Sequence, residues 1–481
     1  MPIKIKSFLQ KALKQDNNLL KRREARGSPV ELHTSVSLAT EPEEWRVTGR
    51  YNVGPVKYLV YKDDYGVPRL HIREPPHPGV ERLKELVTGH DIPRNMIEKY
   101  HLDKARSGYG SIYPLIIDPH IEEIAVDGPH RPVAVIHKYY PGRWMNTDIV
   151  LDEEEADSLS LQLARKAGRI VSIASPYAEG LTGEGHRVAV TFRREISRFG
   201  STAVIRKYPS RPITIADLIA AKVISPLAAA YLWILIEAQA FIVIIGNMGS
   251  GKTTLLQALA GLIPPYYRIV TIEDTPELRL PHDHWDSLIV RSKTPGGEAP
   301  EISLEDLLRF SLRRRAEYII VGEVRGRETR LLAQAAASGH GSLTTFHADS
   351  PEGAILRMRL DPINLPPLFL QVITAFVLVR RIPVVGGKVK RRMYSITEVN
   401  GDELVEIFEW RANTDTHAPQ RPWEVLEASK KLAWAWEKLG VPHEDLEAEL
   451  DDRAKFLERT KGMEPSAFHN ELLNYYSSRG W

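Results

Sequence analysis

The chain has no cysteine among its 481 residues. Disulfide bonds, zinc sites made of thiolates and cysteine nucleophiles are therefore excluded together. The hydrophobic fraction of 43% and the charged fraction of 26% are typical of globular proteins. The length leaves room for about three domains.

A hydrophobic run long enough to cross a membrane is also missing. The longest apolar stretch, residues 227–245, is interrupted by Glu237 and Gln239 and leads into a glycine-rich turn. This pattern predicts a core helix followed by a core strand. The N-terminus shows no apolar segment with a small-residue cleavage site, so we expect the protein to stay in the cytoplasm.

An excess of charge of one sign is lacking too, because 64 Lys and Arg residues face 62 Asp and Glu residues. A net charge of +2 does not indicate a nucleic-acid-binding protein. Residues 1–26 are the local exception, since many basic residues there face only Asp16 and Glu24. They would form a cationic amphipathic helix for an anionic membrane surface or an acidic partner, and a solvated tail is the alternative. Aromatic residues are nearly absent from this segment, so we expect no nucleic acid partner.

The segment GNMGSGKTTL, residues 246–255, follows the apolar run FIVII. A glycine-rich turn between a buried strand and a helix is typical of a phosphate-binding loop. The glycines let backbone N–H groups surround the phosphates, Lys252 supplies a positive charge, and Thr253 offers a hydroxyl to Mg²⁺. We therefore expect the cofactors ATP and Mg²⁺. The residues expected to contact them are Gly246, Gly249, Ser250, Gly251, Lys252, Thr253 and Thr254.

Strands and helices alternate from residue 214 to about residue 385, which predicts an α/β fold with a mostly parallel sheet covered by helices. The expected strands are 241–245, 268–273, 287–291, 317–322, 342–347 and 375–380. A hairpin around Asn400 and Gly401 is expected to close this domain. The predicted segments are a basic N-terminal segment with a small domain (1–104), an α/β domain (105–208), a hinge (209–214), the nucleotide-binding domain (215–412) and a helical tail (413–481).

The predicted strand that ends at residue 273 is followed directly by further acidic residues. A carboxylate beside a phosphate-binding loop can orient and deprotonate the attacking water in phosphoryl transfer. We assign this role to Glu273. The alternative is a turn or helix-capping acid, which suits Asp274 better than Glu273.

Two further strand ends carry polar residues. Glu323 follows a run of four apolar residues and a glycine, an arrangement that holds Mg²⁺, and the length of glutamate favours contact through a water molecule. His340 and His347 lie on either side of a strand expected near the γ-phosphate. Two histidines beside a nucleotide site indicate phosphate sensing, and the alternative is that they are ordinary core or loop residues.

These four segments in this order resemble the type II/type IV secretion and pilus ATPase superfamily. Its members carry a Walker A loop, an aspartate box, a Walker B segment and a histidine box. The matching segments are GNMGSGKTT, TIEDTPEL, IIVGEVRGRET and GHGSLTTFHADS. The sequences around these segments resemble those of the archaeal branch that drives type IV pili and the archaellum. The match extends from about residue 105 to residue 412.

The resemblance implies a RecA-like P-loop core preceded by a smaller PAS-like domain, and a homo-hexameric ring. It implies catalysis at Glu273, support of the metal at Glu323 and a coupling role for His340 and His347. It also implies that two arginines of the preceding domain, Arg187 and Arg206, reach the nucleotide. The alternative for these arginines is pairing with local acids such as Glu184 or Glu195. The four-cysteine zinc module of bacterial members is absent.

The expected function is therefore a cytoplasmic hexameric ATPase, peripheral to the inner face of the cell membrane. It would push a polytopic membrane platform protein and so insert pilin-like subunits into a filament. A secretion motor or an archaellum-rotation motor of the same family is an alternative, as is a DNA-uptake or conjugation motor. A scaffold that binds ATP without turnover is a third possibility from a different class.

Overall fold

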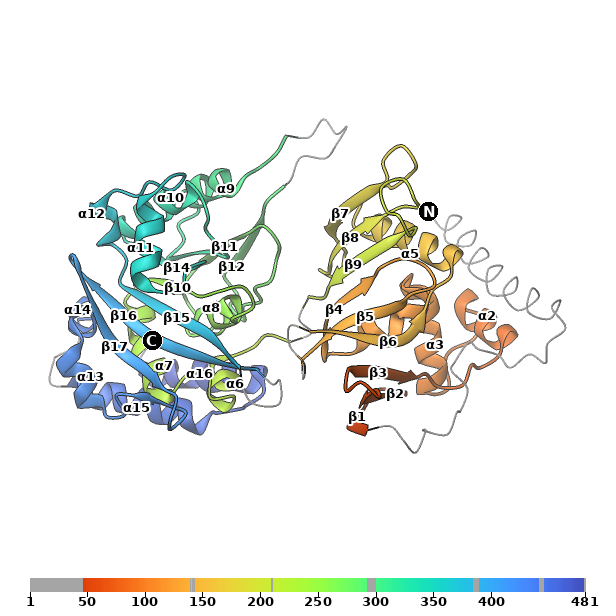
Figure 1. The fold of residues 1–481 in the computed structure, drawn as a ribbon. Coiled ribbons are helices and arrows are strands. Elements are labelled where there is room, and N and C mark those ends of the chain that lie inside the picture. Colours follow the sequence, from red (N-terminus) through yellow and green to blue (C-terminus); the bar gives the residue numbers. More distant parts are fainter. Residues whose placement is uncertain are drawn as a thin grey trace. The chain divides into compact units, whose positions relative to one another are not determined.

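The computed structural model describes residues 46–138, 140, 143–208, 211–291, 300–383, 389–440 and 445–479. The basic segment 1–26 lies outside the described residues. The chain forms two compact units that meet in the sequence between residues 209 and 210. We call residues 46–208 the N-terminal unit and residues 211–479 the C-terminal unit. Each contains its own nine-stranded sheet (Figure 1).

The sheet of the N-terminal unit has the strand order β1-β2-β3-β6-β5-β4-β9-β8-β7. Its neighbouring strands run antiparallel, except β3 and β6, which pair in parallel. Side chains alternate between the two faces of a strand, and in β8 the buried and exposed residues alternate accordingly. The strands are β1 (Arg46–Val53), β2 (Val56–Lys62), β3 (Pro68–Arg73), β4 (Ile121–Val126), β5 (Pro132–His137), β6 (Trp144–Val150), β7 (Tyr177–Leu181), β8 (Arg187–Thr191) and β9 (Thr202–Arg206).

Helices cover the apolar face of this sheet. Ile124 and Val135 of the sheet pack in one core with Leu115 and Leu163 of the helices. The helices are α2 (Val80–Thr88), α3 (Met96–Ser107), α4 (Tyr113–Ile117) and α5 (Glu153–Lys166), with a 3₁₀ turn η1 (Gly110–Ile112) before α4. The sequence places a domain boundary at residue 104, whereas the structure joins both sides of it, because β3 pairs with β6 and Tyr100 of α3 lies in the shared core.

The sheet of the C-terminal unit has the strand order β12-β11-β13-β14-β10-β15-β16-β17-β18. Strands β12 to β15 of this order run parallel, and the pairs from β15 to β18 run antiparallel. The six expected strands are present close to their predicted bounds, and β16 and β17 form the expected hairpin. The strands are β10 (Phe241–Ile245), β11 (Ile269–Glu273), β12 (Trp285–Ile289), β13 (Tyr318–Val321), β14 (Gly341–Phe346), β15 (Ala375–Pro383), β16 (Val389–Asn400), β17 (Glu403–Arg411) and β18 (Thr416–Ala418).

Helices cover both faces of this sheet, which explains why its strands β10 and β13 are apolar along their whole length and why β14 is buried throughout. In β10, Ile242 and Ile244 face one core, whereas Val243 and Ile245 face the other. The first core contains α6 (Ile215–Ala220), α7 (Pro226–Glu237), α8 (Lys252–Ala260), α13 (Pro422–Ala428), α14 (Lys430–Lys438), α15 (Leu446–Arg459) and α16 (Pro465–Ser477). The second contains α9 (Leu304–Ser311), α10 (Glu328–Ala337), α11 (Pro351–Arg359) and α12 (Pro367–Leu370).

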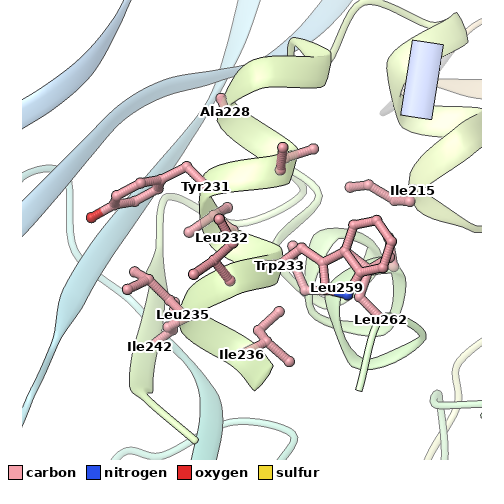
Figure 2. Close-up of a cluster of buried hydrophobic side chains, with 14 of the residues drawn as sticks. Ile215, Ala228, Tyr231, Leu232, Trp233, Leu235, Ile236, Ile242, Leu259 and Leu262 are labelled. Atoms are coloured by element: carbon pink, nitrogen blue, oxygen red, sulfur yellow. The ribbon is translucent and has the colours of Figure 1, made fainter. Parts of the chain in front are cut away.

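Helix α7 lies at the centre of the first core and is buried from Leu227 to Glu237. Figure 2 shows Tyr231, Leu232 and Trp233 pointing in different directions from this helix. A helix that is apolar on all sides must be surrounded by other elements. The surrounding elements here are the sheet, α8 and the C-terminal helices.

The C-terminal helices are part of this core. The sequence predicts a helical tail over 413–481. Residues 416–418 instead form β18, and the helices begin at Pro422. Phe456, Leu472 and Tyr476 of these helices are buried against α7 and its neighbours. The Nε1 atom of Trp233 donates a hydrogen bond to the hydroxyl of Tyr476 at 2.8 Å. Within the described ranges, no helix combines the length and the hydropathy of a membrane span.

Candidate functional site

The glycine-rich loop connects the carboxyl end of β10 to the first turn of α8. A Cβ atom on Gly246 would lie 2.4 Å from the carbonyl oxygen of Val379 and 2.6 Å from Oγ of Ser250, so only glycine fits there. Gly251 has φ +99 and lies directly before the first residue of α8. The loop therefore leads into the positive end of the helix dipole, where an anion is stabilised.

Lys252 is buried at the start of α8. Its Nζ donates to the carbonyl oxygen of Asn247 at 3.2 Å and lies 3.4 Å from Nδ1 of His347. Burial lowers the pKa of Lys252, and the negative charge of Glu323 opposes this shift. A buried ammonium beside backbone N–H groups is suited to a phosphate, which would compensate its charge directly.

Glu273 is the last residue of β11 and is 3% exposed. Its Oε1 accepts hydrogen bonds from the backbone N–H groups of Glu277 at 2.8 Å and Leu278 at 3.1 Å. Burial raises the pKa of Glu273 to about 7, and the two backbone hydrogen bonds only partly oppose this effect. Oε2 is buried and has no hydrogen-bond partner among the described residues. A carboxylate with one fixed oxygen and one available oxygen can act as a general base near neutral pH.

Glu323 follows β13 and contacts Arg325 and His347. Its carboxylate accepts from Nε and Nη2 of Arg325 at 2.8 and 2.7 Å, and Nε2 of His347 lies 3.0 Å from its Oε1. Burial opposes ionisation of Glu323, but the contact with Arg325 and the charges of His347 and Lys252 outweigh it and lower the pKa. Lys252, His347, Glu323 and Arg325 thus form one continuous chain of contacts at the carboxyl edge of the sheet.

The two histidines lie at opposite ends of β14. His347 follows Phe346, the last residue of the strand, and joins the chain of contacts with Lys252 and Glu323. His340 precedes Gly341, the first residue, and its Nδ1 lies 2.7 Å from the carbonyl oxygen of Ala316. A strand of six residues spans about 20 Å, so the structure does not bring His340 to the glycine-rich loop.

A bound nucleotide fits the residues present. Oγ of Ser250 and Oε2 of Glu273 are buried polar atoms without a hydrogen-bond partner among the described residues, so both are available to a ligand. Thr253 and Thr254 occupy the first turn of α8. The described residues contain no cluster of three or more His, Asp or Glu side chains that could hold a metal ion by themselves. Mg²⁺ needs no such cluster when substrate phosphates supply ligands.

Arg187 and Arg206 lie in the N-terminal unit, on the neighbouring strands β8 and β9. Arg187 lies 3.9 Å from Glu179, and Arg206 lies 3.8 Å from Glu123. Both arginines thus approach local acids, as the alternative interpretation of the sequence expects, and the acids are Glu179 and Glu123. Glu184 pairs with Lys166 instead.

Three arginines at the loop were not predicted from the sequence. Arg325 donates two hydrogen bonds to the carboxylate of Glu323. Arg381 of β15 and Arg391 of β16 pack against the glycine-rich loop. Arg325 stands only two residues after Glu323, so its side chain could have been considered with that acid. The other two are more than 120 residues from the loop, and no local pattern connects them to it.

The chain matches known proteins through these same segments. The model of the type II/IV secretion system protein family matches residues 187–403. An uncharacterized protein of Methanocaldococcus jannaschii is 35% identical over 390 residues, which cover 79% of this chain and 68% of that protein. The chain belongs to the type II/IV secretion ATPase superfamily. The resemblance carried by the four motifs is thereby confirmed at this level.

Other relatives match shorter stretches of the chain. A second uncharacterized protein of M. jannaschii is 41% identical over 248 residues, 50% of this chain and 89% of that protein. The type IV secretion system protein PtlH of Bordetella pertussis is 44% identical over 132 residues, 27% of this chain and 39% of PtlH. Among solved structures, the VirB11 ATPase of the Brucella suis type IV secretion system shows 27% identity over 60% of this chain and 95% of its own, with a TM-score of 0.31, too low for a structural conclusion.

Proposed function

We propose that this chain hydrolyses ATP and works as the motor of a type IV pilus-like assembly. The observation that carries the proposal is the buried Glu273 with a raised pKa and one available oxygen, at the same sheet edge as the phosphate-binding loop. A base with a pKa near 7 can accept a proton from water at neutral pH, which is what hydrolysis of a phosphoanhydride requires.

The proposed roles follow from the contacts. The loop and the buried Lys252 bind the phosphates, and Glu273 orients and deprotonates the attacking water. Thr253 and Glu323 support Mg²⁺, which supplies charge neutralisation of the phosphates when it is bound. His347 connects Lys252 to Glu323 and can couple the occupancy of the loop to the position of that acid. His340 keeps a coupling role only if it acts from the opposite edge of the sheet.

The finer architecture is also a proposal. We assign a RecA-like P-loop core within the C-terminal unit, a PAS-like domain within the N-terminal unit and a hinge to residues 209–214. In a homo-hexameric ring, Arg187 and Arg206 would approach the nucleotide when this domain closes over it. Their exposed positions on one strand pair support such a role.

We further propose that the motor acts on a polytopic membrane platform protein and, through it, on pilin-like subunits. It would lie in the cytoplasm at the inner face of the membrane, with residues 1–26 available to anionic lipid. Secretion or conjugation is the second candidate, because relatives carry such names: the PtlH type IV secretion protein and a putative conjugal transfer protein of Mycobacterium tuberculosis, 36% identical over 213 residues.

A comparison of two neighbouring acids tests the catalytic proposal. Glu273→Gln should bind ATP with near-parental affinity and lose phosphate release by at least about a hundredfold, in the range expected for a positioned catalytic group. Asp274→Asn removes the same charge one residue later at an exposed position and should retain most activity. Phosphate release by Glu273→Gln within a few-fold of the parent would exclude this residue as the base and leave Glu323 as the next candidate.

A further inference from the structure

Strand β15 extends beyond the strand that carries the phosphate-binding loop. The last residue of β10, Ile245, pairs with Leu378, and β15 then continues to Pro383. This extension passes the loop closely, as the approach of Val379 to Gly246 shows. Side chains alternate along a strand, so Arg380 and Arg381 point to opposite faces.

Arg381 and its cross-strand partner Arg391 both lie against the loop. Nε of Arg391 donates to the carbonyl oxygen of Gly249 at 3.3 Å, and its Cδ lies 3.2 Å from the position of a Cβ on Gly251. Nη1 of Arg381 lies 3.4 Å from the position of a Cβ on Gly249. Two side chains from one hairpin therefore occupy the surface of the glycine-rich turn.

This arginine pair, Arg381 and Arg391, carries charge that the described residues do not neutralise. The two residues are directly opposite each other in the antiparallel pairing of β15 and β16. Like charges at opposite positions destabilise a strand pair. No acidic side chain in the described part of the chain forms an ion pair with either guanidinium. The next arginine along β16, Arg392, is instead held by Asp415 at 2.8 Å.

Uncompensated positive charge at one place on a protein surface marks a site for an anion. A phosphate chain held by the loop would be the nearest anion, because Arg391 binds the loop backbone and Arg381 lies beside Gly249. Arg391 also donates to the Gly249 carbonyl oxygen, and a carbonyl held in this way limits the conformations that the loop can adopt.

We propose that the arginine pair is part of the nucleotide site, where it positions the loop and makes affinity depend on the number of phosphates. This inference rests on the proposed function and deepens it, because it assigns selectivity for a nucleoside triphosphate over a diphosphate to two residues of the hairpin. Arg381 and Arg391 are positioning residues in this scheme, and hydrolysis itself stays with Glu273.

The test measures dissociation constants of fluorescent ATP, ADP and AMP analogues for the full chain. Arg381→Gln/Arg391→Gln should weaken ATP binding about tenfold, which corresponds to about 1.4 kcal/mol. The affinity for ADP should fall by a smaller factor, and the affinity for AMP should equal that of the parent. Arg391→Lys keeps the charge, so it should retain most of the preference for ATP over ADP. Lysine thereby separates the charge effect from loss of the Nε contact.

Arg380→Gln is the matched control, because Arg380 is on the same strand but faces away from the loop. Its Nη2 donates to the carbonyl oxygen of Asp349, and its guanidinium lies 3.8 Å from the centre of the Tyr394 ring. It should bind all three nucleotides within about twofold of the parent, as expected for an exposed charge away from the ligand.

The outcomes separate this inference from the proposed function. A double variant that binds ATP as the parent does would overturn the inference, and so would an equal loss of affinity for ATP, ADP and AMP, which indicates general damage to the loop. A parent that binds ATP but does not hydrolyse it would overturn the proposed function and leave the inference standing. A parent that binds none of the three nucleotides would overturn both.

Discussion

Arg187 on β8 lies directly opposite Arg206 on β9, and each approaches a glutamate at almost 4 Å. Two like charges at opposite positions destabilise an antiparallel strand pair. An exposed ion pair at this distance stabilises the fold by at most about 1 kcal/mol. The proposal that these arginines approach the nucleotide during function therefore needs a test that separates it from their local contacts.

Removal of these two charges is the first prediction. Arg187→Ala/Arg206→Ala should keep its melting temperature within a few degrees and keep nucleotide binding, while hydrolysis falls at least about a hundredfold, as expected for arginines that stabilise transition-state charge. Arg194→Ala removes an exposed arginine that pairs with Glu153 in the same unit and is the control. Full activity in a folded double variant would show that both arginines serve local contacts only.

Lys252 leads to the second prediction. Lys252→Met removes the buried charge of the loop while keeping most of the volume of the side chain, so nucleotide binding should fall below detection by calorimetry. Lys222→Met, which changes an exposed lysine of the same unit, should bind like the parent. Measurable ATP affinity within tenfold of the parent would mean that the loop does not bind phosphate through this amine.

The raised pKa of Glu273 leads to the third prediction, on stability. The carboxyl has its ordinary pKa of 4.5 when the chain is unfolded and a pKa of about 7 when it is folded. The folded state thus binds the proton more tightly, and stability should fall as the pH rises from 4.5 through 7. The Glu273→Gln side chain cannot ionise. Relative to the parent, the free energy of unfolding of this variant should therefore rise by about 3 kcal/mol across this pH range.

Urea denaturation at pH 5 and pH 8 measures this difference. The Gln variant should be close to the parent at pH 5 and more stable at pH 8, with Asp274→Asn as the control that shows no such change. A constant difference between the Gln variant and the parent across this range would mean that the carboxyl is solvated and titrates normally.

A buried ion pair leads to the fourth prediction. Arg453 of α15 is 3% exposed, and its Nη1 lies 2.6 Å from Oε2 of Glu237, the last residue of α7. Arg453→Met leaves that glutamate charge buried without its partner and should cost about 3–5 kcal/mol. Arg453→Met/Glu237→Gln should recover much of this loss. Lys455→Met, at an exposed position of the same helix, should change the free energy of unfolding by less than about 1 kcal/mol.

The sequence predicted the parallel strands and the strand, glycine-rich turn and helix at residues 241–260, for a physical reason. Strands buried on both faces are continuous apolar runs, and the glycine pattern at 246–251 has a specific local conformation. Parallel strands bring their carboxyl ends to one edge, so Glu273, Glu323 and His347 were expected together and are found at that edge. The same rule, applied strictly, would have placed His340 at the other edge.

The parts that were missed depend on contacts between distant residues. The β16–β17 hairpin was predicted, but the pairing of β15 with β16 was not. The position of Arg381 beside the loop also depends on how β15 pairs with β10. The final helices were predicted as helices, but their alternation of charged and apolar residues does not say which surface they cover. That surface is α7, whose apolar residues on every side required partners that the sequence analysis had not assigned.

The position of α7 has a consequence for the synthesis of the protein. Residues 226–237 emerge from the ribosome well before residues 446–477. The hydrogen-bond acceptor of Trp233 is nevertheless the hydroxyl of Tyr476, which follows 243 residues later. Until then this apolar helix has no permanent cover on one side, and the nascent chain must keep it from other chains. We therefore expect cotranslational chaperone binding to concentrate on chains that have passed residue 237 and not yet reached residue 477.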